Sequence, residues 1–594
     1  MFLSENLSGV MPSVSVGLQD FGGTGLFSAE YIAASKHLTD RVTATVGIGW
    51  GRLGSHNGLE NPLAILSNAF QTRPNTWNAG KISFQSFFRG DAAIFAATDW
   101  MATDNLRFSA EYSSDSMNNE VNYLGYDYRI PINVGAQYRF AHGGTLGVSL
   151  LSGSMIGVSY SFTLDPKNPP SHSGREPGPP AIGAGSTDSL QAWTPKVDPV
   201  HRARLDAALR NQGIAMSGIE VRDNVAVVDI YNMSWPAAAQ AYGRTAAVLS
   251  MQLPHEISTF KIRTHERGMP ITQVTLRRSD LEDLEYALDG SWQSYARAGI
   301  FDAALSPGVS PLWQQSADLW VAPYVTPFFF DPDNPVRADA GITVAADWSP
   351  FLGGYLSGAV NKKLVGNLDQ ADRPSNSVLP HVRSDAWLYA KESDFYLPYL
   401  TASYFWRPGE DLYARASAGL LERMFGGVSG EMLWAPPGEK FSFGMDLSYA
   451  KQRDFDGLLG FQDYDVVTGF LSGYYDFGGG FLGQVDVGRY LAKDWGATFT
   501  VTRRFNNGFE FGAFATLTDV SSDDFGEGAF DKGIMLSIPI SWFTGKPSRD
   551  HTGFLLRPIL RDGGAQLIER DRLYPLTRPD RQEELASRWG QFWR

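Results

Sequence analysis

Apolar and polar side chains alternate with a period of two along most of this chain, in segments of about 9–12 residues. In the segment 441–449, one face collects Phe441, Phe443, Met445, Leu447 and Tyr449, and the other collects Ser442, Gly444, Asp446 and Ser448. A period of two is the period of a β-strand that has one apolar face. The sequence therefore predicts a mainly β protein.

Such strands fit either a soluble sandwich or a transmembrane antiparallel β-barrel. Three features favour the barrel. The segments have the length of tilted membrane strands, whereas sandwich strands average nearer 5–6 residues. Their second face is rich in Gly, Ser and Thr, and aromatic residues gather near segment ends, as in the aromatic girdles of membrane barrels. These aromatics include Trp50, Tyr138, Phe140, Phe162, Trp406, Trp434, Tyr474, Tyr475, Trp542 and Phe543. The soluble all-β fold remains the alternative.

Composition excludes several classes of protein. The 594 residues contain no Cys, which excludes a disulfide scaffold, a Cys-ligated metal site and a Cys nucleophile. The net charge of −14 argues against a nucleic-acid partner, because nucleic-acid binders present a basic face. The residues after Met1 lack the basic and apolar regions of a signal peptide. Because the barrel pattern needs export from the cytoplasm, we expect the natural N-terminus to lie upstream of Met1.

The pattern divides the chain into five parts. Residues 1–164 predict a first barrel, 165–190 a Pro/Gly/Ser linker, 191–290 a small α/β domain, 318–560 a second barrel and 561–594 a charged tail. Within 191–290 the expected order is α-β-β-α-β-β-α. Ser234 is expected to cap its second helix, and a capping box of Ser279 and Glu282 is expected to start its last. In a barrel protein this water-soluble domain would lie in the periplasm.

The chain predicts two barrels rather than one. Two segments match the signal of a closing strand, in which a Gly precedes two apolar or aromatic residues at fixed spacing. One carries Gly157, Tyr160 and Phe162, and the other carries Gly533, Leu536 and Ile538. The first barrel shows nine strand-like segments, an odd number that suggests missing upstream strands, because bacterial single-chain barrels have even counts. A single barrel with an inserted domain remains the alternative.

Several blocks resemble the YjbH family of exopolysaccharide-associated outer-membrane proteins. These blocks span the chain and lie at 16–31, 33–36, 47–51, 486–498, 525–534, and 557–565. The resemblance implies a role in making or exporting an exopolysaccharide at the outer membrane of a Gram-negative bacterium. Family members carry a signal peptide and further residues before the first block, which this chain lacks. The resemblance thus leaves open the mode of anchoring, including a lipid anchor, and the first strands.

No motif for catalysis, a cofactor or a metal stands out. The nine histidines show no metal-ligand spacing; they are His37, His56, His142, His172, His201, His255, His265, His381 and His551. The densest acidic cluster of the second half comprises Asp523, Asp524, Glu527 and Asp531. It fits a calcium or sugar loop, since Ca²⁺ prefers oxygen ligands, but a solvated loop is the simpler interpretation.

The polar faces of the second barrel give candidate lumen-lining residues: Tyr413, Arg415, Gln484, Asp486, Arg504 and Glu510. A polar wall with aromatic side chains suits a glycan, whose hydroxyls form hydrogen bonds and whose ring faces stack. The same wall suits a generic porin or a plugged barrel.

We therefore expect a non-enzymatic outer-membrane protein that helps an exopolysaccharide cross or attach to the membrane. Its expected partners are outer-membrane lipid, the exopolysaccharide and other envelope export proteins, which the α/β domain would dock. No cofactor and no nucleic acid is expected. The alternatives are a barrel-borne glycan or lipid hydrolase and a closed structural barrel.

Overall fold

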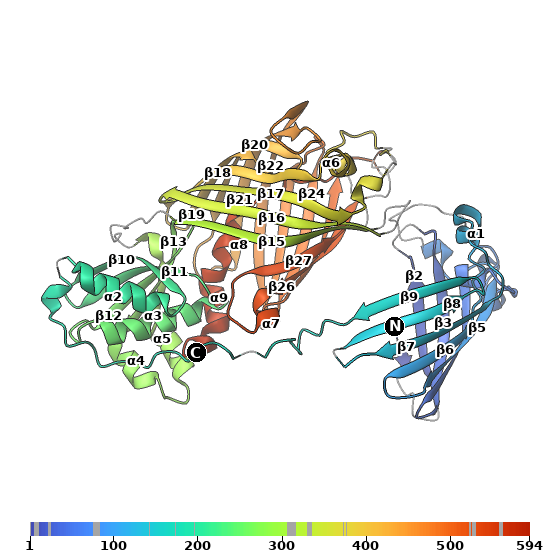
Figure 1. Cartoon of the computed structure of the whole chain (residues 1–594), viewed down its shortest axis with the longest axis horizontal. Helices are drawn as coiled ribbons and strands as arrows, with labels where there is room; N and C mark the ends of the chain where they lie inside the picture. Colours follow the sequence, from blue (N-terminus) through green and yellow to red (C-terminus); the bar gives the residue numbers. More distant parts are fainter. Residues whose placement is uncertain are drawn as a thin grey trace. The chain divides into compact units, whose positions relative to one another are not determined.

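The computed structural model describes residues 2–4, 11–21, 25–74, 84–141, 143–172, 174–194, 196–305, 316–329, 336–371, 374–375, 377–521, 524, 530–557 and 562–594. Over these residues the chain is mainly β, as predicted, and forms sheets of nine, five and thirteen strands (Figure 1). It divides into two compact units: the first holds Met1–Asp165, and the second holds Pro166–Gly526 and Phe530–Arg594.

The first unit is one antiparallel sheet in sequence order. Its strands are β1 (Phe2–Ser4), β2 (Ser13–Gln19), β3 (Ala29–Thr39), β4 (Val42–Gly51), β5 (Ala92–Met101), β6 (Leu106–Tyr112), β7 (Ile132–Arg139), β8 (Gly144–Leu151) and β9 (Met155–Phe162). A short helix, α1 (Asn118–Leu124), follows β6.

A predicted strand at 81–89 is wrong over its described part. Phe84–Ser86 form a 3₁₀ turn, and Phe88 has a φ of 57°, which no extended strand accommodates. The loop is instead tied to the sheet by the buried carboxylate of Glu30. That carboxylate pairs with Arg73 at 2.7 Å and accepts the Phe88 backbone N–H at 3.0 Å.

The second unit begins with the α/β domain. Its elements are α2 (Pro199–Arg210), β10 (Ile214–Arg222), β11 (Val225–Asn232), α3 (Ala238–Gln252), β12 (Thr259–Glu266), β13 (Met269–Arg277), α4 (Arg278–Leu284), α5 (Gly290–Arg297) and β14 (Gly299–Asp302). The sheet runs in sequence order, and only β11 and β12 pair in parallel, because α3 carries the chain across between them.

Two of the predicted helix caps are wrong. Helix α3 starts after Ala237, and the Ser234 side chain does not cap it. Helix α4 starts at Arg278, ahead of Ser279, and has no side-chain cap. The buried Arg278 guanidinium instead binds backbone carbonyls, including that of Ser250 at 2.6 Å. This contact places the first turn of α4 against the end of α3.

Thirteen antiparallel strands follow and curl into a near-closed barrel (Figure 1). They are β15 (Ser316–Phe329), β16 (Val336–Phe351), β17 (Gly354–Gly366), β18 (Phe395–Gly409), β19 (Leu412–Leu420), β20 (Phe425–Trp434), β21 (Phe441–Arg453), β22 (Phe461–Gly478), β23 (Phe481–Arg489), β24 (Trp495–Arg504), β25 (Glu510–Thr518), β26 (Asp531–Pro539) and β27 (His551–Leu556).

Each segment predicted as a strand between 318 and 560 overlaps one of these strands. The predicted strand at 530–543 ends early, because Pro539 is followed by a short helix, α7 (Ile540–Thr544). The second closing-strand signal, at Gly533–Ile538, therefore lies on the penultimate strand β26 rather than on the last. Another short helix, α6 (Ala386–Glu392), precedes β18.

The two faces of the barrel wall differ sharply. Large apolar side chains are exposed on its outer face, and they include Leu319, Val321, Phe443, Leu447, Leu471, Val487, Val501, Phe511 and Phe554. Polar side chains such as Arg415, Glu431, Asp446 and Ser448 are buried on its inner face. A water-soluble monomer seldom exposes so large an apolar surface. No helix in the described parts of the chain is long and apolar enough to cross a membrane.

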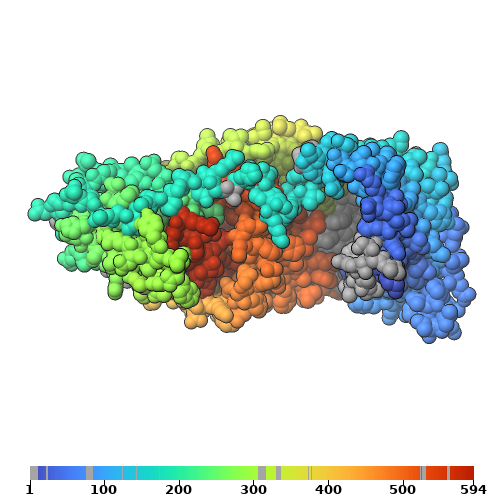
Figure 2. All heavy atoms as spheres, turned by 90° about the horizontal axis from the view of Figure 1, so that it is seen from below, coloured from blue at the N-terminus to red at the C-terminus, as the bar shows by residue number. Residues whose placement is uncertain are grey.

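The last residues of the chain complete the core of the α/β domain. Helices α8 (Leu573–Thr577) and α9 (Gln582–Arg588) lead to Trp589 and Phe592, whose side chains pack with the buried residues of α3 and its sheet. Gly243 of α3 permits this approach, because a Cβ there would lie 1.8 Å from the Phe592 carbonyl oxygen. In Figure 2 the red C-terminal residues lie between the green α/β domain and the orange strands.

Replacing Phe592 with Ala is predicted to destabilise the α/β domain. Truncation of a buried Phe costs about 3–5 kcal/mol, so the amides of α3 should exchange hydrogen much faster by mass spectrometry. Ile568→Ala is the matched control, since that side chain in the same segment is 65% exposed. Equal protection of α3 in both variants would show that the C-terminal residues do not stabilise this core.

Candidate functional site

The interior of the barrel is occupied by the end of its own chain. Residues 562–594, here called the lumen segment, follow β27 and run back through the barrel to the α/β domain. Their hydrogen bonds and ion pairs tie them to both mouths and to the wall between. The candidate site is therefore this lumen together with the segment that fills it.

At the mouth away from the α/β domain, the distal mouth, loops fold over the start of the lumen segment. The Asp562 carboxylate accepts hydrogen bonds from the Arg383 and Ser384 backbone N–H groups at 2.8 and 2.9 Å. Arg383 also pairs with Glu422 at 2.6 Å. Val382, Leu421, Phe425, Leu491 and Ala565 form an apolar cluster beside these contacts. Buried apolar packing and charge pairs together hold the start of the segment at this mouth.

In the middle of the lumen, charges of the wall and of the segment alternate. Arg572 of the segment pairs with Asp446 at 2.7 Å and with Glu431 at 3.5 Å. Arg415 of the wall pairs with Glu431 at 3.2 Å and with Glu569 of the segment. All five side chains are largely buried. Each charge therefore needs its partner, because an unpaired buried charge is costly.

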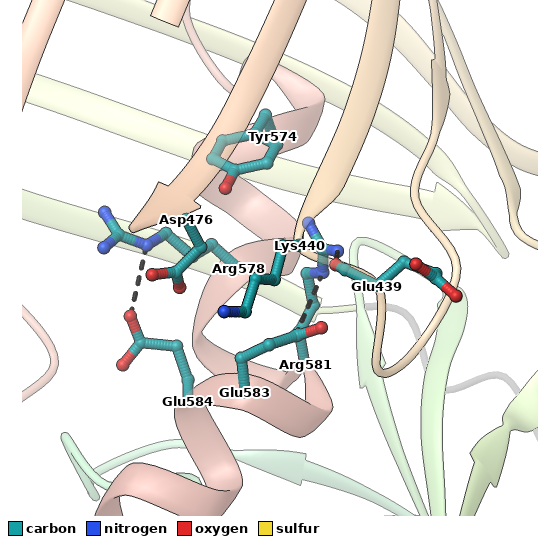
Figure 3. Close-up of a pocket in the computed structure, with 8 residues that line it drawn as sticks. All are labelled: Glu439, Lys440, Asp476, Tyr574, Arg578, Arg581, Glu583 and Glu584. Carbon is teal, nitrogen blue, oxygen red and sulfur yellow. Dashed lines mark hydrogen bonds and ion pairs between the residues drawn. The ribbon is translucent and has the colours of Figure 1, made fainter. Parts of the chain in front are cut away.

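Towards the α/β domain, the segment lies against β21 and β22. Tyr574 stacks on Tyr474 with ring centroids 3.9 Å apart and planes nearly parallel. Arg581 donates to the Ser442 hydroxyl at 2.7 Å. Arg578 pairs with Glu584 at 3.1 Å, a contact that also appears in Figure 3. These contacts hold α8 and α9 against the wall.

A small polar cavity remains beside these residues (Figure 3). It is lined by Glu439, Lys440, Asp476, Tyr574, Arg578, Arg581, Glu583 and Glu584. Its volume is about 10 Å³, roughly what one water molecule needs. A sugar ring does not fit into this space as it stands.

The second mouth is covered by the α/β domain. Met269 and Ile271 of β13 pack with Phe405 and Tyr413 of the wall and with Leu573 of the segment. Arg407 donates to the Pro270 carbonyl at 2.5 Å and pairs with Asp302 at 2.6 Å. The Thr272 hydroxyl donates to the Asp580 carbonyl at 2.7 Å. The α/β domain, the wall and the segment thus share one interface.

All six residues predicted to line the lumen lie on the inner face of the wall, and five have charged or hydrogen-bonded partners there. Arg415 pairs as described, and Gln484 donates to Asp486 at 2.9 Å. Arg504 pairs with Glu510 at 3.1 Å and with Glu584 of the segment at 3.4 Å. Tyr413 lies under the Arg407 guanidinium, 3.9 Å from its ring centroid. The structure thus places them in a filled lumen.

No pattern in the sequence indicates the segment that fills this lumen. Residues 561–594 show no hydrophobic periodicity. Their many charged side chains are the one sequence feature consistent with a polar, charged lumen. Of the predicted acidic cluster, Asp523 and Glu527 lie outside the described residues, as does His142 among the histidines. Asp524 accepts from the Ser521 hydroxyl, and Asp531 lies 3.5 Å from Arg557. Asp524 and Asp531 thus interact with different neighbours.

A buried acidic pair lies where the α/β domain meets the barrel. Glu266 ends β12 and pairs with Arg549, in the loop before β27, at 2.5 Å. Burial raises the pKa of Glu266 to about 7, while Arg549 opposes that shift and the nearby Asp580 adds to it. Burial also raises the pKa of Asp580. One guanidinium thus faces two carboxyl groups in this interface.

Comparisons with known proteins find one family and one close relative for nearly the whole chain. The family model YjbH, described as "Exopolysaccharide biosynthesis protein YbjH", matches residues 1–579. A protein of Escherichia coli (strain K12), named "Uncharacterized lipoprotein YjbH", is 30% identical over 593 residues, covering 96% of this chain and 82% of that protein. A crystal structure of a mutant of the ferric enterobactin receptor PfeA of Pseudomonas aeruginosa aligns with a TM-score of 0.20 at 9% identity. This alignment covers 88% of this chain and 71% of that one.

Arg572→Ala is predicted to loosen the lumen segment. It leaves the Asp446 carboxylate without its guanidinium and removes one of the two arginines that pair with Glu431, a loss of about 3 kcal/mol. Amides of residues 566–577 should therefore exchange hydrogen roughly a hundredfold faster. Arg503→Ala is the control, because Arg503 lies over the Phe481 and Phe505 rings, on the face of β24 opposite to the buried Thr502. Equal exchange in both variants would contradict the role of these ion pairs.

The interface at Glu266 is predicted to weaken as the pH rises. The pKa of Glu266 is raised from its ordinary 4.5 to about 7, so the folded state holds a proton that the unfolded chain releases. The contribution of Glu266 to stability is therefore complete below about pH 4.5 and falls by about 3 kcal/mol as the pH rises to 7. Thermal unfolding between pH 5 and 8 should show a smaller pH dependence for Glu266→Gln. An unchanged slope would assign the pH dependence to other groups.

Proposed function

The chain belongs to the YjbH family, and on that premise we propose that it is a non-enzymatic outer-membrane protein of exopolysaccharide export or assembly. Its second barrel would act as a conduit that its own lumen segment closes at rest. The observation that supports this proposal is a polar segment held inside a polar wall by exchangeable contacts. The chain thereby takes part in exopolysaccharide processes through binding and gating rather than catalysis.

The location in the outer membrane rests on the surface of the barrel. Exposed apolar side chains such as Leu447, Leu471 and Val501 cover the outer face of the strands, which is the pattern of a lipid-facing band. The lipoprotein relative supports a place in the cell envelope. The α/β domain, which covers one mouth, would then lie in the periplasm and dock other export proteins.

The gating idea follows from the kind of contact that holds the segment. Arg572, Arg578 and Arg581 bind the wall or their neighbours through ion pairs and hydrogen bonds. A hydrated glycan offers hydroxyl groups that can replace such contacts one at a time, which an apolar plug would not allow. Displacement of the segment would open the polar wall to the glycan, and its return would close the barrel.

The filled lumen also favours one alternative, a closed scaffold. If the segment never leaves, the barrel serves to hold the α/β domain at the membrane for assembly of other components. The hydrolase alternative has less support, because the lumen carboxylates Glu431, Asp446 and Glu569 are each paired with a guanidinium. We therefore retain the scaffold as the second candidate.

A disulfide that locks the segment separates conduit from scaffold. The chain has no Cys, so an introduced pair is unambiguous. A Cβ built on Gly564 lies 3.2 Å from the Thr516 Cβ on β25, slightly less than the roughly 3.5–4.5 Å of a disulfide. Gly564 has a φ of 73°, so the bond forms after a small shift of the segment. Thr516→Cys/Gly564→Cys fixes the segment at the distal mouth, while Trp589 and Phe592 hold its other end in the α/β core.

We expect the oxidised pair to abolish secretion of exopolysaccharide in a producing strain that carries this chain as its only family member. Reductant should restore secretion. The matched control is Gly183→Cys/Met251→Cys, whose Cβ atoms are also 3.2 Å apart but do not join the lumen segment. Secretion that is indifferent to the lock would contradict the conduit and favour the scaffold. Normal exopolysaccharide without the chain would overturn both.

A further inference from the structure

The first and last strands of the thirteen-stranded sheet are related differently from every pair of neighbouring strands in it. Neighbouring strands from β15 to β27 pair antiparallel, and their directions alternate along the order of the sheet. The first and the thirteenth strand therefore run parallel to each other. No ladder joins β15 to β27 in the part of the chain that the structure describes.

The boundary between β15 and β27 is here called the seam. Its backbone pairing is expected to be the least stable in the wall. A parallel ladder is slightly less stable per residue than an antiparallel one. The two strands also differ in length, since β15 has 14 residues and β27 has 6. In a bilayer, unpaired backbone groups at a sheet edge cost several kcal/mol each, so the seam must either close or admit something that covers it.

The side chains beside the seam show what could enter. A row of cross-strand partners runs from β27 to β24. Leu555 pairs with Met535, Met535 with Gly512, and Gly512 with Thr502. Paired residues share a face, and Thr502 shares the inner face with Arg504, so Leu555 points into the lumen. It is 51% exposed. An exposed leucine on the inner wall contrasts with the paired charges of the opposite wall.

The other edge of the seam has the same character. A similar row runs from β15 to β18. Trp320 pairs with Ala345, Ala345 with Ala359, and Ala359 with Tyr399. Tyr399 lies under the Arg570 guanidinium of the lumen segment, 3.8 Å from its ring centroid, so Trp320 also faces the lumen. It is 43% exposed. Apolar inner surface thus flanks both sides of the seam.

The lumen segment is held by ion pairs to strands other than the two at the seam. Among the described residues, its ion pairs to the wall reach Arg415, Glu431, Asp446, Arg504 and Glu510, which lie on strands β19 to β25. Ile568 of the segment is 65% exposed. In the part of the chain that the structure describes, the ion pairs of the segment do not reach β15 or β27.

We propose that the β15–β27 seam is a lateral opening between lumen and bilayer that admits the acyl chain of a lipid-linked glycan. The inference rests on the proposed function, because it requires the barrel to lie in a membrane. Leu319, Val321 and Phe554 continue the outer apolar band up to the seam, and Trp320 and Leu555 continue it inside. A glycan head would follow the polar wall while its acyl chain stays between the two edges.

An acyl chain fits these observations better than a partner β-strand. A strand would pair with the backbone edges, but it would leave the lumen-facing Trp320 and Leu555 against polar space. A flexible hydrocarbon covers both side chains and remains continuous with the surrounding lipid. Capture of a protein strand is therefore an outcome that the test must be able to report.

The experiment uses lipid quenching of single-cysteine variants of the full chain in liposomes. Leu555→Cys carries a fluorescent bimane, and the probe is phosphatidylcholine with a doxyl group on its acyl chain. Val501→Cys on the outer face of β24 is the lipid-facing control, and Thr500→Cys on the inner face of the same strand is the lumen control. Trp320→Cys provides a second seam position if Leu555→Cys folds poorly.

We expect quenching at Leu555 and Trp320 within about twofold of that at Val501, and much weaker quenching at Thr500. Seam labels that behave like the Thr500 label, with Val501 quenched, would overturn the opening. No quenching at Val501 would instead overturn the membrane location on which the proposed function rests. In cells, a photocrosslinker at Leu555 should yield a lipid adduct, and a protein adduct as the sole product would overturn the choice of occupant.

Discussion

Paired charge inside the barrel is the interaction on which the rest of this structure depends. Arg572 lies between Asp446 and Glu431, and Arg415 joins Glu431 to Glu569. Burying any one of these charges alone costs much free energy, whereas burying them as ion pairs costs far less. The wall can therefore be polar and buried only while the lumen segment supplies its counter-charges. A barrel emptied of this segment must take in water or a hydroxyl-rich ligand in its place.

The same segment couples the barrel to the α/β domain within the second unit. It starts at the distal mouth near Asp562, packs against Tyr474 on the inner face of the wall and ends in the domain core at Phe592. A force that displaces it therefore acts on an apolar core at one end and on exchangeable polar contacts along the rest. Docking of a partner on the α/β domain could in this way change the state of a lumen that the partner does not touch.

The sequence was informative where the structure is periodic. Alternation in segments such as 441–449 predicted the strands of the barrel and the inner position of Arg415 and Asp486, because a period of two fixes the face of every residue. The resemblance carried by blocks such as 486–498 predicted the family, which the family model and the relative confirm.

The failures have physical causes of their own. The lumen segment lacks a period, and its structure depends on contacts with residues more than a hundred positions away, such as Glu569 with Arg415 and Arg572 with Asp446. Local signals also failed where tertiary contacts dominate. Ser279 matched a capping box, but the buried Arg278 guanidinium sets the start of α4 by binding backbone carbonyls. A predicted strand at 81–89 ends in a left-handed residue, Phe88.

The most direct test of this account is the electrical conductance of the purified chain in planar bilayers. The account predicts that the intact chain conducts little through its second barrel and that Arg572→Ala produces frequent openings, because the segment loses its ion pairs to Asp446 and Glu431. A steady conductance that is the same in the intact chain and in Arg572→Ala would contradict the claim that the lumen segment closes the barrel.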